Sequence, residues 1–354
     1  MAMSTVSAAT IANSSTNSTN MQHGELAVSL RYLYTTLMVC ILAITIFGNA
    51  ILVLVIYFHR RLCTTTNIFI ANLAVGDMLL AAAVIPFDID RLMRGYFAHS
   101  KTVCEFSSTL FLLSLPASAI NLLIMTFERY CAVRFPLEHR AGSLFTKRRL
   151  VALLVCSWIY IAGTAMLPIM GWRSGTTEVS SGECLFYFDI EYAVFILVAN
   201  FVCPLLLIII MNICILNIAR NTLFRKGTKK FSGQSQKFLA RSTSVTSSTS
   251  NTANNKATKI IAILVGVFAF CWLPYILNTT INIVCRGCSL QEIGLATLIL
   301  VYMNSAINPI LYGMYKPQIR STLKVILSNV CRKMRICKFK EKLDTERDME
   351  ETCL

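Results

Sequence analysis

The chain alternates between long apolar blocks and shorter polar segments, and the blocks are long enough to cross a membrane. A helix needs about 20 predominantly apolar residues to span the hydrocarbon core of a bilayer. Lipid offers no partner for backbone N–H and C=O groups, so each such block is predicted to be helical. Seven blocks meet this length: Tyr32–Phe58, Leu62–Phe87, Phe106–Phe127, Leu150–Trp172, Tyr192–Ala219, Ile260–Cys285 and Ile293–Tyr315.

The composition agrees with this pattern and excludes an ordinary soluble protein. Of 354 residues, 55% are hydrophobic and 14% are charged, and the mean hydropathy is +0.60. Soluble domains carry about 25% charged residues. The alternating pattern of an outer-membrane β-barrel is absent. The sequence therefore predicts an all-α membrane protein, a seven-transmembrane helix bundle.

The net charge of +15 indicates orientation. Nucleic-acid binding would need a basic stripe on a soluble fold, whereas the Lys and Arg residues here lie between apolar blocks. Cytoplasmic loops carry an excess of Lys and Arg, which predicts an extracellular N-terminus and a cytoplasmic C-terminus. In this orientation 27 of the 33 basic residues lie inside, and the six outside are Arg31, Arg91, Arg94, Lys101, Arg173 and Arg286.

The polar segments divide the chain further. Residues 1–31 are predicted to be an extracellular N-terminus with glycosylation acceptors at Asn13 and Asn17, although such tripeptides also occur by chance. Residues 32–315 form the transmembrane domain. Within it, residues 221–257 are basic and then rich in Ser, Thr and Asn, which predicts a disordered third cytoplasmic loop. This loop is either a flexible linker or a phosphorylatable contact for a cytoplasmic partner.

The remaining residues, 316–354, are predicted to be a cytoplasmic tail. Pro317–Leu327 places apolar residues on one helical face, which suits a helix in the membrane interface. Cys331 and Cys337 follow among basic residues and are either palmitoylated or free thiols. The terminal Thr352-Cys353-Leu354 fits the C-terminal pattern that PDZ domains bind, although three residues match easily by chance.

Cysteines on the extracellular side predict disulfides. Most of the 14 cysteines lie inside the spans, where cysteine acts as a small apolar residue. Cys104 precedes the third span and Cys184 lies in the second extracellular loop. Both face an oxidising compartment, so a bridge between them is expected. Cys285 and Cys288 form a second candidate pair; their spacing also resembles half of a metal site, but no second Cys/His pair accompanies it.

One acidic residue, Asp77, lies near the middle of a span. Ionisable groups inside a membrane are costly and indicate function. Asn49, Ser118, Asn304 and Asn308 lie at comparable depths in other spans. Oxygen ligands around one carboxylate suit a small cation such as sodium, and the alternative is a hydrogen-bonded polar cluster that holds the helices together.

Nine short motifs occur in order along the chain: Gly48-Asn49, Leu73–Asp77, Cys104, Glu128-Arg129-Tyr130, Trp158, Cys184, Pro204, Phe268–Pro274 and Asn308–Tyr312. Together they resemble the rhodopsin-like (class A) G-protein-coupled receptors over about Tyr32–Leu327. The segment from Glu128 to Leu137 is most similar to the amine-receptor branch. One such motif would be weak evidence, but nine in order exclude a chance match.

The resemblance implies roles for several of these residues. Arg129 would pair with Glu128 at rest and meet a heterotrimeric G protein when active, and arrestin is a further implied partner. Trp272 would lie beneath the ligand pocket, and Pro274 would kink the sixth span so that its inner end swings outward. Tyr312, after Asn308-Pro309, would rotate inward. The positions of Asp77, Ser118, Asn304 and Asn308 match those of an allosteric sodium site.

The ligand is left open because the pocket departs from the amine-receptor pattern. Those receptors carry an aspartate eighteen residues before the motif arginine, and here that position is Phe111. A desolvated ammonium needs a counter-charge, so binding of a biogenic amine in the usual way is disfavoured. Asp88, Asp90 and Glu105 are either alternative charges or solvated carboxylates at the rim. The pocket candidates are Asp88, Phe111, Leu112, Asn200, Trp272 and Tyr302.

Two departures on the cytoplasmic side concern activation. The inner end of the sixth span reads Asn254-Asn255-Lys256 and lacks the acid that commonly clasps the motif arginine. Asn212 replaces a tyrosine that commonly supports the active state. The first change loosens the resting state and the second weakens the active one, and we expect measurable basal signalling.

Other functional classes fit the chain less well. A transporter usually shows repeats and broken helices, and none is visible. An enzyme needs a constellation of catalytic residues, but the four histidines, His23, His59, His99 and His139, are scattered. The remaining alternative is a receptor-fold protein without its own small ligand, which acts constitutively or by pairing with other receptors.

Overall fold

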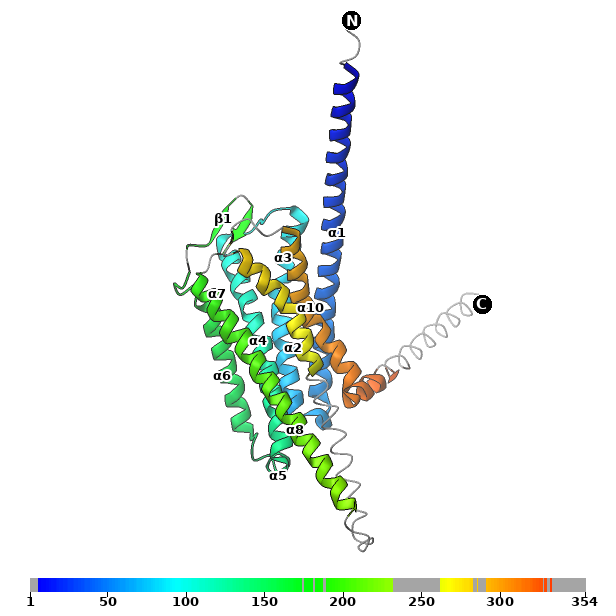
Figure 1. The fold of residues 1–354 in the computed structure, drawn as a ribbon, viewed down its shortest axis with the longest axis vertical. Coiled ribbons are helices and arrows are strands. Elements are labelled where there is room, and N and C mark those ends of the chain that lie inside the picture. Colours follow the sequence, from blue (N-terminus) through cyan, green and yellow to red (C-terminus); the bar gives the residue numbers. More distant parts are fainter. Residues whose placement is uncertain are drawn as a thin grey trace, which may run out of the picture.

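The computed structural model confirms the predicted helix bundle. It describes residues 6–173, 175–180, 182–186, 189–231, 262–282, 285, 291–326, 328–329 and 332, with the backbone alone for residues 6–27, 61, 140, 180, 185, 219, 221–231 and 291–292. Within these ranges, seven helices are long and apolar enough to cross a membrane. They pack side by side, with a small hairpin over one end of the bundle (Figure 1).

The elements follow in chain order, and the second and fifth spans are each built from more than one of them. They are α1 (Val6–Phe58, whose span is Val28–Phe58), α2 (Thr65–Ala83), α3 (Ile85–Arg94), α4 (Lys101–Arg134), α5 (Pro136–Arg140), α6 (Lys147–Met166), β1 (Glu178–Ser180), β2 (Glu183–Leu185), α7 (Ile190–Leu197), a π-helical turn (Val198–Val202), α8 (Cys203–Phe231), a helix at Ala262–Asn282 and α10 (Gln291–Tyr315). A short helix at residues 317–326 follows α10, as the amphipathic pattern predicted.

The second span is longer than predicted and is built from two helices. Pro86 cannot donate to the preceding turn. The helix α2 ends at Ala83, and the backbone of the next residue, Val84, leaves helical geometry. The polar residues after Phe87 continue the helix as α3, which ends at Gly95 with a left-handed φ of 78°. This glycine is a common helix terminator. As a result, Asp88 lies on a helix of the bundle.

The fifth span contains a wide turn. Pro204 has no N–H group, so the carbonyl of Asn200 loses its usual helical donor. The chain forms a π-helical turn at Val198–Val202, in which the Cys203 N–H donates to the Val198 carbonyl. After this turn α8 continues to Phe231, although the sequence predicted a loop from residue 221. Residues 221–231 contain three Lys, one Arg and one Leu, all of which favour helix.

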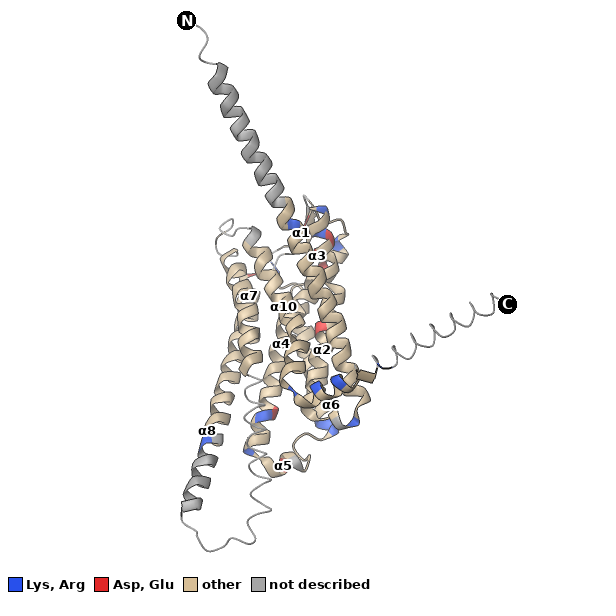
Figure 2. Cartoon of the chain, turned by 90° about the vertical axis from the view of Figure 1, so that its right-hand side faces the viewer, with Lys and Arg blue, Asp and Glu red and all other residues tan. Residues whose placement is uncertain are grey.

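The helix α4 lies at the centre of the bundle, where it contacts α2, α6 and α8, while α1 packs on α2 and α10. The strands β1 and β2 pair antiparallel at what we call the hairpin end. The opposite end carries α5 and is called the α5 end. Figure 2 shows many of the Lys and Arg positions gathered near the α5 end, the end predicted to be cytoplasmic.

The helices α1 and α10 approach each other closely around Pro309. A Cβ atom on Gly48 would lie only 2.8 Å from the Pro309 Cγ atom, so this position requires glycine. Pro309 also leaves the carbonyl of Ser305, four residues earlier, without a helical donor. The side-chain amide of Asn49 donates to that carbonyl at 3.2 Å. The Gly48-Asn49 motif is thus explained by the kink that it accommodates.

Candidate functional site

A cavity of about 320 Å³ lies at the hairpin end of the bundle, between α3, α4, α7, α10 and the helix Ala262–Asn282. This volume is at the lower end of the range of ligand sites, about 300–1,000 Å³. Five of the predicted pocket residues line it: Asp88, Phe111, Leu112, Trp272 and Tyr302. Asn200 does not. It is fully buried and accepts a hydrogen bond from the Tyr160 hydroxyl at 3.0 Å.

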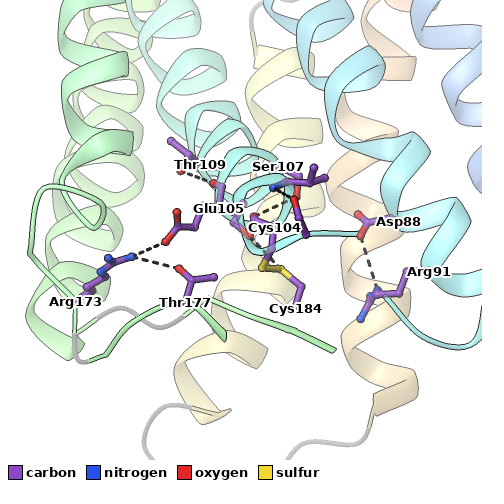
Figure 3. The surroundings of a disulfide bond; sticks show 12 residues. Asp88, Arg91, Cys104, Glu105, Ser107, Thr109, Arg173, Thr177 and Cys184 are labelled. Atoms are coloured by element: carbon purple, nitrogen blue, oxygen red, sulfur yellow. Dashed lines mark hydrogen bonds and ion pairs between the residues drawn. A yellow bond between two sulfur atoms is a disulfide. The ribbon is translucent and has the colours of Figure 1, made fainter. Parts of the chain in front are cut away.

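The hairpin is tied to α4 beside this cavity. The predicted disulfide joins Cys104 at the start of α4 to Cys184 on β2 (Figure 3). The Arg173 guanidinium donates to Glu105 at 3.1 Å and to the Thr177 hydroxyl at 3.2 Å. Glu105 is therefore held in an ion pair rather than exposed to the cavity. These links fix the loop that covers the bundle.

The cavity walls carry one acidic and one basic residue among those described, Asp88 and Arg91. The Tyr302 hydroxyl, which is completely buried, donates to the Asp88 carboxylate. The Arg91 Nε atom lies 4.0 Å from Asp88 Oδ1, which is too long for a hydrogen bond. Figure 3 shows Asp88 and Arg91 near the disulfide.

Phe111 occupies the centre of an aromatic group at the base of the cavity. Its ring centroid lies 5.4 Å from that of Tyr275, 6.1 Å from Tyr302 and 6.3 Å from Trp272. Trp272 in turn lies 6.4 Å from Phe268. The indole N–H of Trp272 is buried and has no partner among the described residues. A contiguous path of packed rings therefore leads from the cavity into the core.

A polar cluster lies deeper in the bundle. The buried Asp77 carboxylate accepts the Asn308 amide at 2.8 Å, and the Asn304 amide donates to the Ser118 hydroxyl at 3.4 Å. In the part of the chain that the structure describes, Asp77 takes part in no ion pair. These two pairs bring together one carboxylate, one hydroxyl and two side-chain amides, and the Asn308 partner of Asp77 is neutral.

The Glu128-Arg129-Tyr130 motif lies at the α5 end, where Glu128 is almost completely buried. The Arg129 Nε atom lies 3.2 Å from Glu128 Oε2, and the Thr66 hydroxyl donates to the same oxygen at 3.0 Å. Arg129 also donates to Thr66. His139 on α5 contacts Glu128 Oε1 at 2.9 Å. Both carboxylate oxygens are therefore engaged, and Arg129 is held against α2.

Three further residues to which the resemblance assigns a role in activation are Tyr312, Pro274 and Tyr130. Tyr312 is buried, and its hydroxyl contacts the Met125 sulfur of α4 at 3.9 Å. Pro274 follows Trp272 within the helix Ala262–Asn282, and Tyr130 is partly buried. These residues belong to three different helices. A change in the packing of one helix would therefore alter the packing of the helices beside it.

The sequence profile described as 7 transmembrane receptor (rhodopsin family) matches residues 48–312. The chain belongs to this family. It is 28% identical over 317 residues to the alpha-1D adrenergic receptor of Rattus norvegicus, covering 81% of this chain and 56% of that receptor. It is also 28% identical over 312 residues to the alpha-1A adrenergic receptor of Mus musculus, covering 82% of this chain and 66% of that receptor.

These relatives confirm the predicted likeness to receptors of the amine branch. The chain spans little more than half the length of the alpha-1D receptors that it matches. The predicted acid-free inner end of the sixth span, the cysteines Cys331 and Cys337 and the terminal Thr352–Leu354 lie outside the described residues. So does Cys288, while Cys285 is disulfide-bonded.

Sequence reasoning missed two contacts of the α5-end cluster. His139 was read as one of several scattered histidines, and nothing in its spacing from Glu128 indicates the contact between them. Lys316 was read only as a basic residue of the tail. It follows α10 directly, and its ammonium donates to the Asn67 side chain at 2.9 Å. Burial, and the positive charge of Arg129 nearby, lower the pKa of Lys316 to about 7.

The lowered pKa of Lys316 predicts a pH-dependent stability. The unfolded chain holds this proton up to its ordinary pKa of about 10.4, whereas the folded protein loses it near pH 7. The buried charge of Lys316 therefore lowers the stability of the folded protein to its full extent below pH 7. This loss of stability is relieved as the pH rises above 7. We expect the melting temperature of the purified protein to rise from pH 6 to pH 9 by more than that of Lys316→Gln.

The control is Lys324→Gln, at an exposed position, which should behave like the unmodified protein. An equal rise of the melting temperature in all three proteins would contradict the prediction.

Proposed function

We propose that this chain is a receptor that transmits an extracellular signal to heterotrimeric G proteins by a conformational shift of its helix bundle. The observation that carries the proposal is the placement of two sites in one bundle. A ligand-sized cavity lies at the hairpin end, and the Glu128–Arg129 pair lies at the α5 end. A ligand that binds one conformation better than the other shifts the population toward it.

The contacts at the α5 end support a resting conformation. Arg129 is held by Glu128 and Thr66, so it is engaged inside the bundle and is not presented to a partner. Movement of the helix Ala262–Asn282 at its Pro274 kink would open this end. The path of rings from Phe111 through Trp272 to Phe268 supplies the mechanical connection. Arrestin would use the same opened face.

The proposal places the hairpin end outside the cell and the α5 end in the cytoplasm. The distribution of basic residues and the disulfide at the hairpin end support this orientation. Asn13 and Asn17 precede the span of α1 and would then be exposed to glycosylation. Sugar at these positions, detected as a loss of mass on enzymatic deglycosylation, would test the orientation independently of signalling.

Basal signalling tests the coupling itself. Without any added ligand, cells that express the full chain are expected to show second-messenger levels above those of cells that express Arg129→Ala. The reason is that Arg129 is the residue that would contact the G protein. The inner end of the sixth span lacks the acid that would form a second ion pair with it. Equal levels at matched surface expression would contradict both the basal activity and the role of Arg129.

The alternative function is a receptor-fold protein that acts constitutively or through receptor pairing. One observation favours it, namely that Phe111 already fills the base of the cavity with an aromatic ring. A signal that no ligand changes, but that depends on co-expression of another receptor, would support this alternative over the main proposal.

We also propose that the Asp77 cluster binds sodium. The fit rests on the buried Asp77 carboxylate, whose partner Asn308 is neutral, and on the buried Ser118–Asn304 pair, whose residues match the family's sodium-site positions. Hard cations prefer such oxygen ligands. When bound, the ion would supply the positive charge that this cluster lacks, and it would hold α2, α4 and α10 together.

Sodium binding predicts an ion-specific stabilisation. A ligand that binds the folded protein raises its melting temperature by mass action. The purified protein is therefore expected to melt at a higher temperature in NaCl than in KCl of equal concentration, and Asp77→Asn should remove the difference. The same NaCl effect in the variant would show that the stabilisation arises elsewhere.

A further inference from the structure

The Asp88 carboxylate has unused capacity to accept hydrogen bonds inside the cavity. An ionised carboxylate offers about four acceptor sites. The Tyr302 hydroxyl fills one of them at Oδ2, and Arg91 stays 4.0 Å from Oδ1. The Asp88 side chain is 23% exposed, compared with 39% for Arg91. The acidic group therefore lies deeper in the cavity wall than the basic one.

The neighbouring Asp90, on the same helix, has basic side chains closer to its carboxylate than Asp88 has. The Arg94 Nε atom donates to Asp90 Oδ1 at 2.7 Å, and the His99 Nε2 atom lies 3.1 Å from Asp90 Oδ2. Asp90 is absent from the cavity lining. The two aspartates of α3 thus differ in the property that a ligand would use, since Arg94 lies within hydrogen-bonding distance of Asp90, whereas Arg91 stays 4.0 Å from Asp88.

The position of Tyr302 explains why Asp88 stays in place without a basic partner. Its buried hydroxyl proton needs an acceptor, and Asp88 is that acceptor. The Tyr302 ring also packs edge-on against Phe111. Phe111 occupies the position at which amine receptors carry their aspartate. One tyrosine therefore connects the vacated position on α4 with the carboxylate on α3.

The rest of the cavity favours a cation over an anion. Eight of the residues that line it are aromatic, and the faces of aromatic rings attract positive charge. The Phe111 ring packs against the rings of Tyr275 and Tyr302, and Tyr302 contacts the carboxylate. An anionic ligand would have to approach Asp88 with a like charge, and Arg91 is the sole basic group among the described lining residues.

We infer that the cavity binds a small organic cation with an aromatic body, and that Asp88, positioned by Tyr302, is the anchor for its positive charge. Relative to the amine-receptor pattern, the counter-charge lies on α3 instead of α4, and it is again surrounded by aromatic residues. This inference rests on the proposed function, because it names the chemical class of ligand for the same cavity.

The inference is tested with three probes that share one body and differ in charge: phenethylamine, 2-phenylethanol and 3-phenylpropanoate. Binding to the full chain in lipid nanodiscs is measured by saturation-transfer NMR. Phenethylamine, which is cationic at pH 7, is expected to bind the unmodified protein more tightly than the neutral and anionic probes. Asp88→Asn should weaken its binding by at least about tenfold, since loss of a desolvated charge partner is costly.

Three further variants keep the result interpretable. Asp90→Asn is the matched control and should bind phenethylamine like the unmodified protein. Asp88→Glu retains the charge and should retain the preference for the cation, which separates loss of charge from misfolding. The double variant Asp88→Asn with Phe111→Asp returns a carboxylate to α4 beside Tyr302, and it should recover cation binding.

Equal binding of all three probes, or of phenethylamine to the unmodified and Asp88→Asn proteins, would overturn the inference. Preferential binding of 3-phenylpropanoate that is lost in Arg91→Gln would overturn it in favour of an anion site. The absence of binding by all three probes would also overturn it. Basal Arg129-dependent signalling of the unmodified chain is measured separately. If that signalling is present while cation binding is absent, the ligand class alone has failed; if it is absent, the proposed function has failed whatever the probes show.

Discussion

Replacing Glu128 with glutamine is expected to raise ligand-free signalling about fivefold or more. The buried carboxylate holds Arg129 at 3.2 Å and also engages Thr66 and His139. Hydrogen bonds to charged groups contribute about 1.5–3 kcal/mol each, but only their difference between the resting and active conformations shifts the equilibrium. A difference of about 1 kcal/mol already changes the ratio of the two conformations about fivefold.

The measurement is second-messenger production in cells that express equal amounts of receptor at the surface. Glu138→Gln is the matched control, because Glu138 is an exposed acid on the same short helix as His139 and should leave the signal unchanged. Combining Glu128→Gln with Arg129→Ala should abolish the increase, since the freed arginine is its cause. A signal from Glu128→Gln no higher than that of the unmodified chain would show that this pair does not hold the resting state.

Replacing Cys104 and Cys184 with serine is expected to lower the free energy of unfolding by about 4.5 kcal/mol. A disulfide that closes a loop of this size restricts the unfolded chain by that amount in the chain-entropy model, and here the two cysteines are 80 residues apart. The bridge also holds the hairpin over the cavity. Loss of ligand binding is therefore expected together with the loss of stability.

Thermal unfolding of the purified protein measures the first effect, and probe binding in nanodiscs measures the second. Cys40→Ser and Cys156→Ser are suitable controls because both residues are free and exposed in the bundle. Unchanged unfolding of the double serine variant would contradict the prediction. Reduced stability with intact binding would show instead that Arg173, through its bonds to Glu105 and Thr177, holds the hairpin by itself.

The bundle, its helices and the family likeness could be predicted from the sequence because the membrane imposes a local rule. A backbone in lipid has to satisfy its own hydrogen bonds, so each span is visible as one apolar block. The seventh block, Ile293–Tyr315, has the same bounds in the structure. The breaks at Val84 and at the π-helical turn were not predicted, because the effect of a proline depends on the packing around it.

Five of the six pocket candidates line the cavity and Asn200 does not, for a related reason. The family likeness placed Trp272 and Phe111 at the base of the pocket, and the structure finds both there. The same reasoning included Asn200, because it lies in the right stretch of the fifth span. The π-helical turn changes the direction of its side chain, and Asn200 instead contacts Tyr160. Side-chain direction inside a span is set by neighbouring helices and not by position along the chain.

The sequence by itself determined the seven spans and the family likeness, and it predicted their sidedness and the residues proposed for coupling, because these depend on local composition and on motifs taken in order. Only the tertiary structure decided which polar groups meet. Tyr302 and Asp88 are 214 residues apart in the chain, and Asn49 and Ser305 are 256 apart. In a bundle of parallel and antiparallel helices such pairs are set by helix rotation, kinks and close approach, and none of these leaves a periodic signal along the chain.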